Sequence, residues 1–399
     1  MERLRGSPSR KNRSMRIAFF STMAGLPWGG SEELWSRAAH ELLRGGHEVA
    51  FCSQKWRSAP EPLERLVQAG AAPSFRTRLR LGRSMRRALE SMRLLRRRYA
   101  RWLRKTHPDL VVVSFSCHTD DPQIANTCHR LGIPYVVLLQ AAGETNWIPP
   151  RSLADFRTAY ANAQRCYFVS GQNREIVETN LALRLPQSEM ADNPFMVPLD
   201  AAPAWPSPEP FWKLACVARL HFASKGQDVL LRALRAPKWR TRPLKVTCWG
   251  HDNGSLQHFR ELIDLYGLQD NVSYGGFADD ITKIWSTHHA LVLPSRVEGN
   301  ALALIEAMIC GRVPIVTNVG RAAELIDDNH SGFIAPAATV ELVDEALERA
   351  WQQRHQWYAM GQLAASAIRE RHSLRPAEDF AERILRLVSP KIPACERAA

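Results

Sequence analysis

Short runs of apolar and β-branched residues alternate with longer stretches of helical periodicity along this chain. The runs cover residues 16–20, 48–52, 109–115, 135–139 and 165–169 in the first half, and 214–217, 244–249, 271–274, 290–293 and 314–317 in the second. Near-continuous apolar strands separated by helices are typical of a parallel sheet covered on both faces. Two such series predict an α/β protein with two doubly wound domains.

A proline-rich break separates the two series. The stretch LDAAPAWPSPEP at 199–210 contains four prolines, which do not fit inside a helix or a central strand. A last helical pattern at 375–388 predicts a helix that packs back on the N-terminal domain. The expected parts are a basic tail, an N-terminal domain, a linker, a C-terminal domain, and a C-terminal helix with its tail, over residues 1–14, 15–199, 200–212, 213–374 and 375–399.

The net charge of +13 is concentrated in one segment. Residues 76–105 carry 13 Lys or Arg against the single acid Glu90. Within it, residues 82–105 predict a helix with one apolar stripe and a cationic face, which ends at His107 and Pro108. The stripe comprises Leu81, Met85, Leu89, Met92, Leu95, Tyr99 and Leu103.

Several partners suit this cationic face. Anionic lipid head groups, an acidic glycan or nucleic acid could bind it, and a merely solvated helix face is the alternative. The sequence disfavours nucleic acid, because no aromatic-interleaved RNA motif and no helix-turn-helix pattern accompanies the arginines.

Other sequence features bear on location and on metals. No apolar run approaches the roughly 20 residues of a membrane-spanning helix, and no apolar stretch follows the basic N-terminus as in a signal peptide. The eight cysteines form no Cys-x-x-Cys pair, and the sequence has no Asp-x-Asp. We expect a cytoplasmic protein with reduced thiols, no metal site and no cofactor. If the basic helix binds lipid, the protein would be peripheral on the inner face of the membrane.

The most informative stretch is 291–306, LVLPSRVEGNALALIE. A strand ends at Pro294, a polar loop follows, and a helix begins near Asn300 or Ala301. The free N–H groups at the start of that helix, up to Leu302, form an anion site suited to a diphosphate. Gly299 allows a ligand to approach the backbone closely.

Two glutamates flank this anion site. Glu298 lies at the mouth of the loop, and Glu306 lies roughly 7–8 Å along the helix axis. That spacing lets one carboxylate bind a sugar and the other a ribose, with a diphosphate between them. Two solvated carboxylates are the alternative.

Three further places follow the ends of predicted strands. Arg219 and Lys225 are two cations suited to a doubly charged leaving group, with plain surface cations as the alternative. Gly29 and Gly30 let the backbone approach a phosphate or acceptor, unless they form a plain tight turn. His118 lies at the carboxyl edge where open α/β sheets bind ligands, although a structural histidine is the alternative.

The ordered block PSR-x-EG followed by EAM-x-x-G-x-P-I-V resembles the signature of retaining glycosyltransferases of family 4, also called glycosyl transferases group 1. The resemblance implies the GT-B fold, with two Rossmann-like domains facing across a cleft. It implies that Glu298 contacts hydroxyls of the donor sugar, that Glu306 holds the ribose, and that the following backbone amides bind phosphate and sugar. It also implies that Arg219 and Lys225 clasp the donor diphosphate and that His118 approaches the sugar.

Three positions depart from the family pattern. Gln140 stands where the family often has a histidine, so an acid/base role is in doubt there. Asn300 replaces a bulky apolar residue or proline, and Arg321 replaces a second glycine. We expect the last two to shift the sugar or acceptor preference.

The combined features predict a metal-independent, retaining hexosyltransferase. Its co-substrate would be a nucleoside diphosphate sugar and its acceptor a saccharide or a lipid-linked sugar, in cell-surface polysaccharide or glycolipid synthesis. Arg219, Lys225 and the helix start would stabilise the departing diphosphate, as a metal ion does elsewhere. A nicotinamide oxidoreductase is disfavoured because the opening strand lacks Gly-x-Gly-x-x-Gly. The alternative function is a non-catalytic GT-B scaffold that binds anionic lipid or nucleic acid through its arginine-rich helix.

Overall fold

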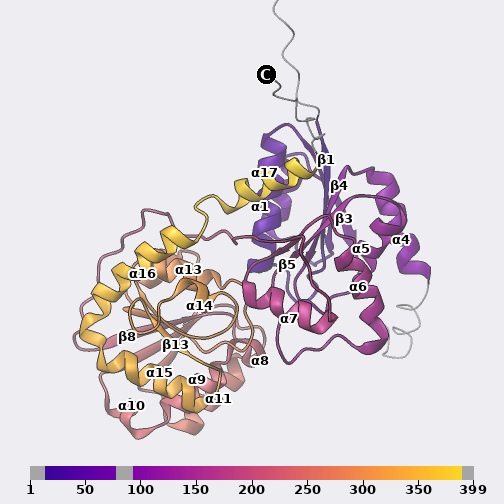
Figure 1. Cartoon of the computed structure of the whole chain (residues 1–399). Helices are drawn as coiled ribbons and strands as arrows, with labels where there is room; N and C mark the ends of the chain where they lie inside the picture. The colour runs from indigo at the N-terminus through magenta and orange to yellow at the C-terminus, as the bar shows by residue number, and fades with distance from the viewer. Residues whose placement is uncertain (1–13, 78–92, 389–399) are drawn as a thin grey trace, which may run out of the picture.

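The chain forms two α/β domains, each built on one parallel sheet (Figure 1). A computed structural model describes residues 14–77 and 93–388. The N-terminal sheet has seven strands in the order β3-β2-β1-β4-β5-β6-β7, and the C-terminal sheet has six in the order β10-β9-β8-β11-β12-β13. In both sheets the order reverses beside the first strand, which is the doubly wound arrangement expected from the sequence.

The strands are short and mostly buried. Their bounds are β1 (Arg16–Ser21), β2 (Glu48–Gln54), β3 (Ala72–Arg76), β4 (Leu110–Phe115), β5 (Tyr135–Leu139), β6 (Cys166–Phe168), β7 (Ser188–Met190), β8 (Trp212–Val217), β9 (Leu244–Trp249), β10 (Val272–Gly276), β11 (Ala290–Leu293), β12 (Val313–Thr317) and β13 (Phe333–Ala335).

Helices connect the strands and cover both sheets. Their bounds are α1 (Gly30–Arg44), α2 (Glu61–Gln68), α4 (Arg93–Thr106), α5 (Gln123–Arg130), η1 (Pro150–Ser152), α6 (Leu153–Ala161), α7 (Gly171–Leu181), α8 (Phe222–Lys225), α9 (Gln227–Leu234), α10 (Pro237–Thr241), α11 (Leu256–Tyr266), α12 (Ile281–Trp285), α13 (Leu302–Ile309), α14 (Ala322–Leu325), α15 (Val340–Gln352), η2 (Arg354–Gln356), α16 (Trp357–Arg371) and α17 (Pro376–Val388).

The central strand β1 shows why the apolar runs are continuous. Ile17 and Phe19 pack on the side of α1, whereas Ala18 and Phe20 pack on the side of α4 and α5. Both faces of the sheet are therefore buried, and each position of the strand needs an apolar side chain. The same holds for the C-terminal sheet, whose two faces contribute to two separate apolar clusters.

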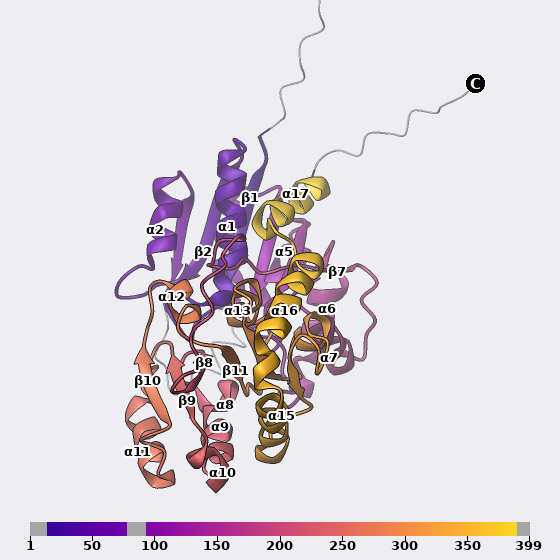
Figure 2. The ribbon, with the colours of Figure 1, turned by 90° about the vertical axis from the view of Figure 1, so that its left-hand side faces the viewer.

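The last helix returns to the first domain. Figures 1 and 2 both show the chain leaving α16 on the C-terminal domain and reaching α17 beside α1. Phe380 of α17 lies in the apolar core of the N-terminal domain, and its ring meets that of Tyr167 edge-to-face at 5.0 Å. The C-terminal helix thereby ties the two domains together.

The described part of the arginine-rich helix predicted over 82–105 is α4, while the predicted stripe residues Leu81, Met85, Leu89 and Met92 lie outside the described residues. Tyr99 and Leu103 are buried in the core of the N-terminal domain. Their helix ends at Thr106, just before His107. The helix therefore docks through its apolar side and leaves its arginines exposed, at positions 96, 97, 98, 101 and 104.

Candidate active site

The loops that carry the predicted cations and glutamates lie next to each other. They follow β8 and β11, which are neighbouring parallel strands, so both loops leave the same edge of the sheet. The backbone N–H of Arg296 donates to the carbonyl of Ser224 over 2.8 Å. A Cβ on Gly226 would lie 1.9 Å from the carbonyl oxygen of Pro294. Glycine at this position therefore lets the two loops pack backbone against backbone.

An ion pair joins the two loops at their tips. The Lys225 ammonium donates to Oε1 of Glu298 over 2.6 Å, and the hydroxyl of Ser295 donates to the same oxygen over 2.8 Å. Beside it, Arg296 binds both carboxylate oxygens of Asp228 at 2.7 and 2.8 Å. This second pair orients the loop and keeps Glu298 in reach of Lys225.

Arg219 adds an uncompensated positive charge. Its side chain is half-buried and makes no ion pair with any residue in the described ranges. The pKa of the neighbouring His221 is lowered, first by burial and then by the charges of Arg219 and Lys225. The edge of β8 is therefore electropositive, and an anion bound there would relieve the repulsion.

Glu306 lies deep in the same site, on α13. It is buried, with 3% exposure, and its Oε1 accepts a hydrogen bond from the backbone N–H of Met196 over 3.0 Å. Burial raises its pKa to about 7, against the opposing effects of the Met196 N–H and Arg37. Arg37 of α1 also donates to the carbonyl of Phe195 over 3.3 Å, so the first domain holds the segment that covers this carboxylate.

Glycines let the two domains meet at the loop of residues 294–301 between β11 and α13, called the donor loop here for its predicted role. A Cβ on Gly299 would lie 1.7 Å from the carbonyl oxygen of Gln140, which follows β5. A Cβ on Gly30 would lie 3.1 Å from Cδ1 of Leu302, the first residue of α13. Gly29 is less crowded, with its nearest contact at 3.9 Å. These close contacts are with protein atoms, so the ligand approach predicted for Gly29, Gly30 and Gly299 stays a prediction.

The start of α13 is open. Its N-cap residue is Ala301, which provides no side-chain cap. The first N–H groups of the helix, beginning at Leu302, therefore have no side-chain acceptor of their own, as the predicted anion site requires.

His118 lies on the first domain, away from this loop. It is buried, its Nε2 is 2.6 Å from the carbonyl oxygen of Asn146, and its backbone N–H donates to Ala141. Burial lowers its pKa. None of its hydrogen bonds within the described residues reaches the donor loop, so its contact with a sugar stays a prediction. The structure places Gln140, not His118, against Gly299.

Three buried side-chain amides belong to residues at or next to the contact between Gln140 and Gly299: Gln140, its partner Asn193, and Asn300. Oε1 of Gln140 accepts from Asn193 over 2.9 Å, and Asn300 lies 3.4 Å from Nε2 of His372. Three amide atoms of this group are buried without a hydrogen-bond partner: Nε2 of Gln140, Oδ1 of Asn193 and Oδ1 of Asn300. Such atoms are costly unless water or a ligand binds them.

Arg321 joins the domains instead of facing a ligand. It forms an ion pair with Asp192, which lies in the segment between β7 and β8, and donates to the carbonyl of Arg371 over 3.0 Å. Nearby, Oε1 of Glu324 accepts from the backbone N–H of Gly171 on α7 over 2.7 Å. The expected effect of Arg321 on substrate preference gains no support from these contacts.

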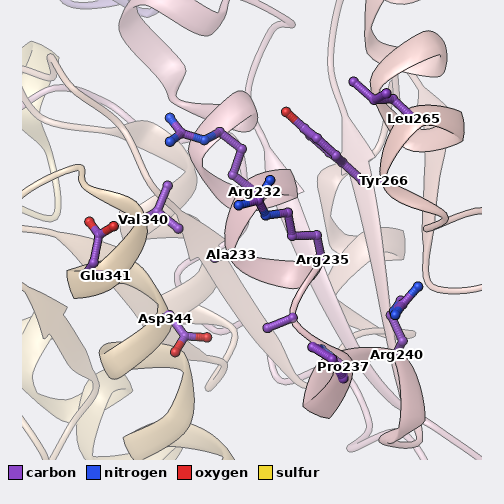
Figure 3. A pocket seen from close by; sticks show the side chains of 11 residues that line it. Arg232, Ala233, Arg235, Pro237, Arg240, Leu265, Tyr266, Val340, Glu341 and Asp344 are labelled. Atoms are coloured by element: carbon purple, nitrogen blue, oxygen red, sulfur yellow. The ribbon is translucent and has the colours of Figure 1, made fainter.

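A separate hollow of about 570 Å³ lies elsewhere on the C-terminal domain. Figure 3 shows it lined by Arg232, Arg235, Arg240 and Tyr266, with Glu341 and Asp344 on one side. Figure 1 places α10 at the end of this domain that faces away from the first domain. The hollow is therefore distinct from the site around Glu298.

Among residues 14–77 and 93–388, no group of three or more His, Cys, Asp and Glu side chains could hold a metal ion. Over the same ranges, no helix combines the length and the apolar character needed to cross a membrane.

Comparison with known families assigns both domains. Residues 28–185 match the model of Glycosyltransferase Family 4, and residues 212–353 match that of Glycosyl transferases group 1. The chain belongs to the family 4-like glycosyltransferases. The two matches lie on either side of the proline-rich linker, one on each domain of this glycosyltransferase.

Curated relatives match parts of the glycosyltransferase. A D-inositol 3-phosphate glycosyltransferase of Saccharomonospora viridis is 30% identical over 137 residues, 31% of either protein. An alpha-D-kanosaminyltransferase of Streptomyces kanamyceticus is 27% identical over 159 residues, 39% of this chain and 41% of the relative. The matched segments thus span well under two thirds of these relatives' own length.

Solved structures match the glycosyltransferase over nearly its full length. HepE of Anabaena, in complex with UDP, superposes with a TM-score of 0.70 at 16% identity, covering 94% of this chain and 100% of HepE. Sucrose-phosphate synthase of Thermosynechococcus elongatus gives a TM-score of 0.71 at 16% identity, covering 94% and 99%. These likenesses, with the two parallel sheets, establish the two-domain GT-B fold.

Proposed function

We propose that this glycosyltransferase transfers a hexosyl group from a nucleoside diphosphate sugar to a saccharide or lipid-linked acceptor, with retention at the anomeric carbon. The single observation that carries the proposal is the Lys225–Glu298 pair at the open start of α13. A cation and a carboxylate meet in the loop that leads into these free backbone N–H groups, which suits a sugar joined to a diphosphate. The complexes of HepE with UDP and with UDP-glucose support a nucleotide sugar as the donor.

In this proposal the diphosphate leaves toward the positive edge of β8. Arg219, Lys225 and the N–H groups at Leu302 stabilise the negative charge that develops on it, so no metal ion is required. Glu306 accepts hydrogen bonds from the ribose hydroxyls, and Glu298 accepts them from hydroxyls of the sugar.

Retention follows from a reaction on one face of the sugar. The bond between the anomeric carbon and the phosphate oxygen breaks, and its electron pair stays on the phosphate. The acceptor oxygen bonds to the same face of the carbon, and its proton passes to the leaving phosphate oxygen. A protein base is then unnecessary, which agrees with Gln140, a side chain that cannot titrate, beside Gly299.

The acceptor proposal rests on the cationic surface of α4. Arg96, Arg97, Arg101 and Arg104 line a hollow together with Arg130 of α5. Burial and the charge of Arg96 lower the pKa of Arg130, so these guanidinium groups repel one another. An anionic membrane surface would relieve that repulsion. We therefore propose a cytoplasmic enzyme, peripheral on the inner membrane face, that serves polysaccharide or glycolipid synthesis.

A donor screen tests the proposed chemistry. The screen uses three proteins: the wild type, Glu306→Ala and the exposed control Glu345→Ala. Each is mixed, in the presence of EDTA, with UDP-, GDP-, ADP- or dTDP-sugars, and its thermal shift and its hydrolysis of the donor are measured. Stabilisation by one nucleotide series in the wild type and the control, lost in Glu306→Ala, supports the proposal. No response to any donor favours the non-catalytic scaffold.

A flotation assay tests the membrane proposal separately. Vesicles containing an anionic phospholipid are mixed with wild type, with a triple Arg→Gln variant at 97, 101 and 104, and with a control triple Arg→Gln variant at 232, 235 and 240. Both triples remove the same charge from exposed surfaces. Loss of flotation only in the first triple supports the proposal, whereas equal flotation of all three proteins contradicts it.

A further inference from the structure

Three arginines line the hollow at the far end of the C-terminal domain. They are Arg232, Arg235 and Arg240, and all three are exposed. None of them forms a hydrogen bond or an ion pair with a residue in the described ranges. Their like charges repel one another, and an anion bound among them would reduce that repulsion.

The acids of α15 on this side of the domain already have other partners. Asp344, which also lines the hollow, accepts from the Lys238 ammonium over 2.7 Å and from the Trp239 indole N–H over 2.6 Å. One turn further along α15, Glu348 binds two nitrogens of Arg242 at 2.7 and 2.8 Å. These contacts neutralise both carboxylates, so the three arginines of the hollow keep their charge.

Two further side chains give the hollow its chemical character. Glu341 on α15 is exposed and has no hydrogen-bond or ion-pair partner among the described residues. Tyr266, at the end of α11, is half-buried, and the guanidinium of Arg235 lies 5.8 Å from its ring centroid. Helix α9, which carries Arg232, packs against both α15 and α11. The hollow therefore combines cations, one free carboxylate and one aromatic ring (Figure 3).

A ligand that uses all of these features has an anionic group, hydroxyl groups and an apolar face. Arginine binds a phosphate or a carboxylate through two parallel N–H groups. A hydroxyl can donate to the ionised Glu341, and the Tyr266 ring offers a flat apolar surface. A long polyanion such as nucleic acid would bring further negative charge next to Glu341, which disfavours it.

We propose that this hollow binds a saccharide that carries a phosphate or carboxylate group. Its volume of about 570 Å³ is in the range of sites for small organic ligands. The site goes beyond the proposed transfer reaction, because it lies apart from the donor loop and shares no residue with it. Two sources offer the required chemistry, a free sugar phosphate and an acidic unit of a longer glycan, and the experiment separates them.

Calorimetric titrations test this site. Glucose 6-phosphate, an oligosaccharide of glucuronic acid, inorganic phosphate and glucose are titrated into the wild type and four variants: Arg232→Gln, Arg235→Gln, Glu341→Ala and the control Arg174→Gln. Arg174 is an exposed arginine of α7, on the other domain. All four substituted side chains are exposed, so the variants should fold like the wild type, which circular dichroism melts verify.

One of the two anionic saccharides should bind the wild type and the control with equal affinity. Each arginine variant should weaken that binding by about 10-fold or more, the loss expected for a hydrogen bond between charged groups. Glu341→Ala should also weaken the saccharide, because a hydroxyl loses its acceptor. In contrast, inorganic phosphate should bind Glu341→Ala at least as tightly as it binds the wild type, since only repulsion is removed.

The saccharide that binds more tightly identifies the source. Preference for glucose 6-phosphate indicates a free sugar phosphate, and preference for the oligosaccharide indicates an acidic glycan. The inference is overturned if neither saccharide binds, or if both arginine variants bind it as the wild type does. It is also overturned if inorganic phosphate or a single-stranded oligothymidylate binds as tightly as the saccharides, because the hollow would then attract anions without recognising a sugar.

Discussion

The ammonium of Lys225 lies 2.6 Å from Oε1 of Glu298, and the two side chains are 17% and 12% exposed. The Ser295 hydroxyl binds the same oxygen, whereas no described residue binds the other carboxylate oxygen. A ligand hydroxyl can therefore bind Glu298 without breaking the pair. The ammonium likewise has two hydrogens left for a phosphate.

A double-mutant cycle on this pair should show strong coupling. Lys225→Met and Glu298→Gln should each lower kcat/KM by about 100-fold or more, because in the proposed mechanism each removes a charge that acts on the donor. Since each variant already breaks the pair, the double variant should be less impaired than the product of the two effects, with an interaction energy of about 1–3 kcal/mol. Steady-state kinetics with the donor found in the screen measures this.

The control is Lys238→Met, which breaks the ion pair of Lys238 with Asp344 on the same domain. It should leave kcat/KM within about twofold of the wild type. Additive effects of Lys225→Met and Glu298→Gln would mean that the two side chains act independently, against the geometry.

Gly299→Ala should prevent the two domains from meeting. The added Cβ would lie 1.7 Å from the carbonyl oxygen of Gln140, which is a backbone atom directly after β5 and not the end of a flexible side chain. We expect a folded protein with at least about 100-fold lower activity, since small misplacements of a reacting group cost that much. Gly25→Ala is the control, because nothing lies within 4 Å of a Cβ there. Full activity of Gly299→Ala would show that this contact does not form during catalysis.

The central strands could be predicted from the sequence because both of their faces are buried. The edge strands β3, β7 and β13 were missed, although the edge strand β10 was predicted. The sequences of β3 (APSFR) and β7 (SEM) are partly exposed and carry no continuous apolar run, whereas β13 (FIA) is apolar but only three residues long. Helix α4 was predicted from its stripe, and its described half confirms the docked side.

The donor loop could be predicted because its residues are contiguous in the sequence. The contacts of Gln140 with Gly299 and of Met196 with Glu306 could not, since they depend on how the two domains pack. Arg321 illustrates the limit best. Its position next to Gly320 indicated a role in substrate preference, but its carboxylate partner Asp192 lies 129 residues away in the sequence. Only the folded chain brings them together.

Arg321→Ala should destabilise the packing of the two domains. The side chains of Arg321 and Asp192 are 11% and 17% exposed, so the variant leaves a nearly buried carboxylate without its cation. Removing one partner of a buried ion pair lowers the free energy of unfolding by about 3–5 kcal/mol. The control Arg184→Ala removes an ion pair whose arginine side chain is 92% exposed, and it should cost under about 1 kcal/mol. Urea unfolding followed by tryptophan fluorescence measures both. Equal stability of the two variants would contradict a structural role for Arg321.

Glu306 should make the ligand-free protein less stable as the pH rises. Burial raises its pKa from 4.5 to about 7, so the folded protein binds this proton more tightly than the unfolded chain does. The stabilisation of the folded state by this proton is complete below pH 4.5 and is lost as the pH passes 7. At 1.36 kcal/mol per pKa unit, the free energy of unfolding falls by roughly 3 kcal/mol over this range.

The test compares variants, because Glu32 is also buried with a pKa of about 7 and contributes the same trend. The unfolding free energy of Glu306→Gln, measured relative to that of the wild type, should rise by about 3 kcal/mol between pH 4.5 and pH 8. The reason is that a neutral amide has no carboxyl proton to release as the pH rises. The exposed control Glu345→Gln should track the wild type over the whole range. The group facing Glu306 most closely is the Met196 N–H, with the charges of Glu33 and Arg37 beyond it. Parallel pH profiles for Glu306→Gln and the wild type would mean that this carboxyl titrates as in water, against its observed burial.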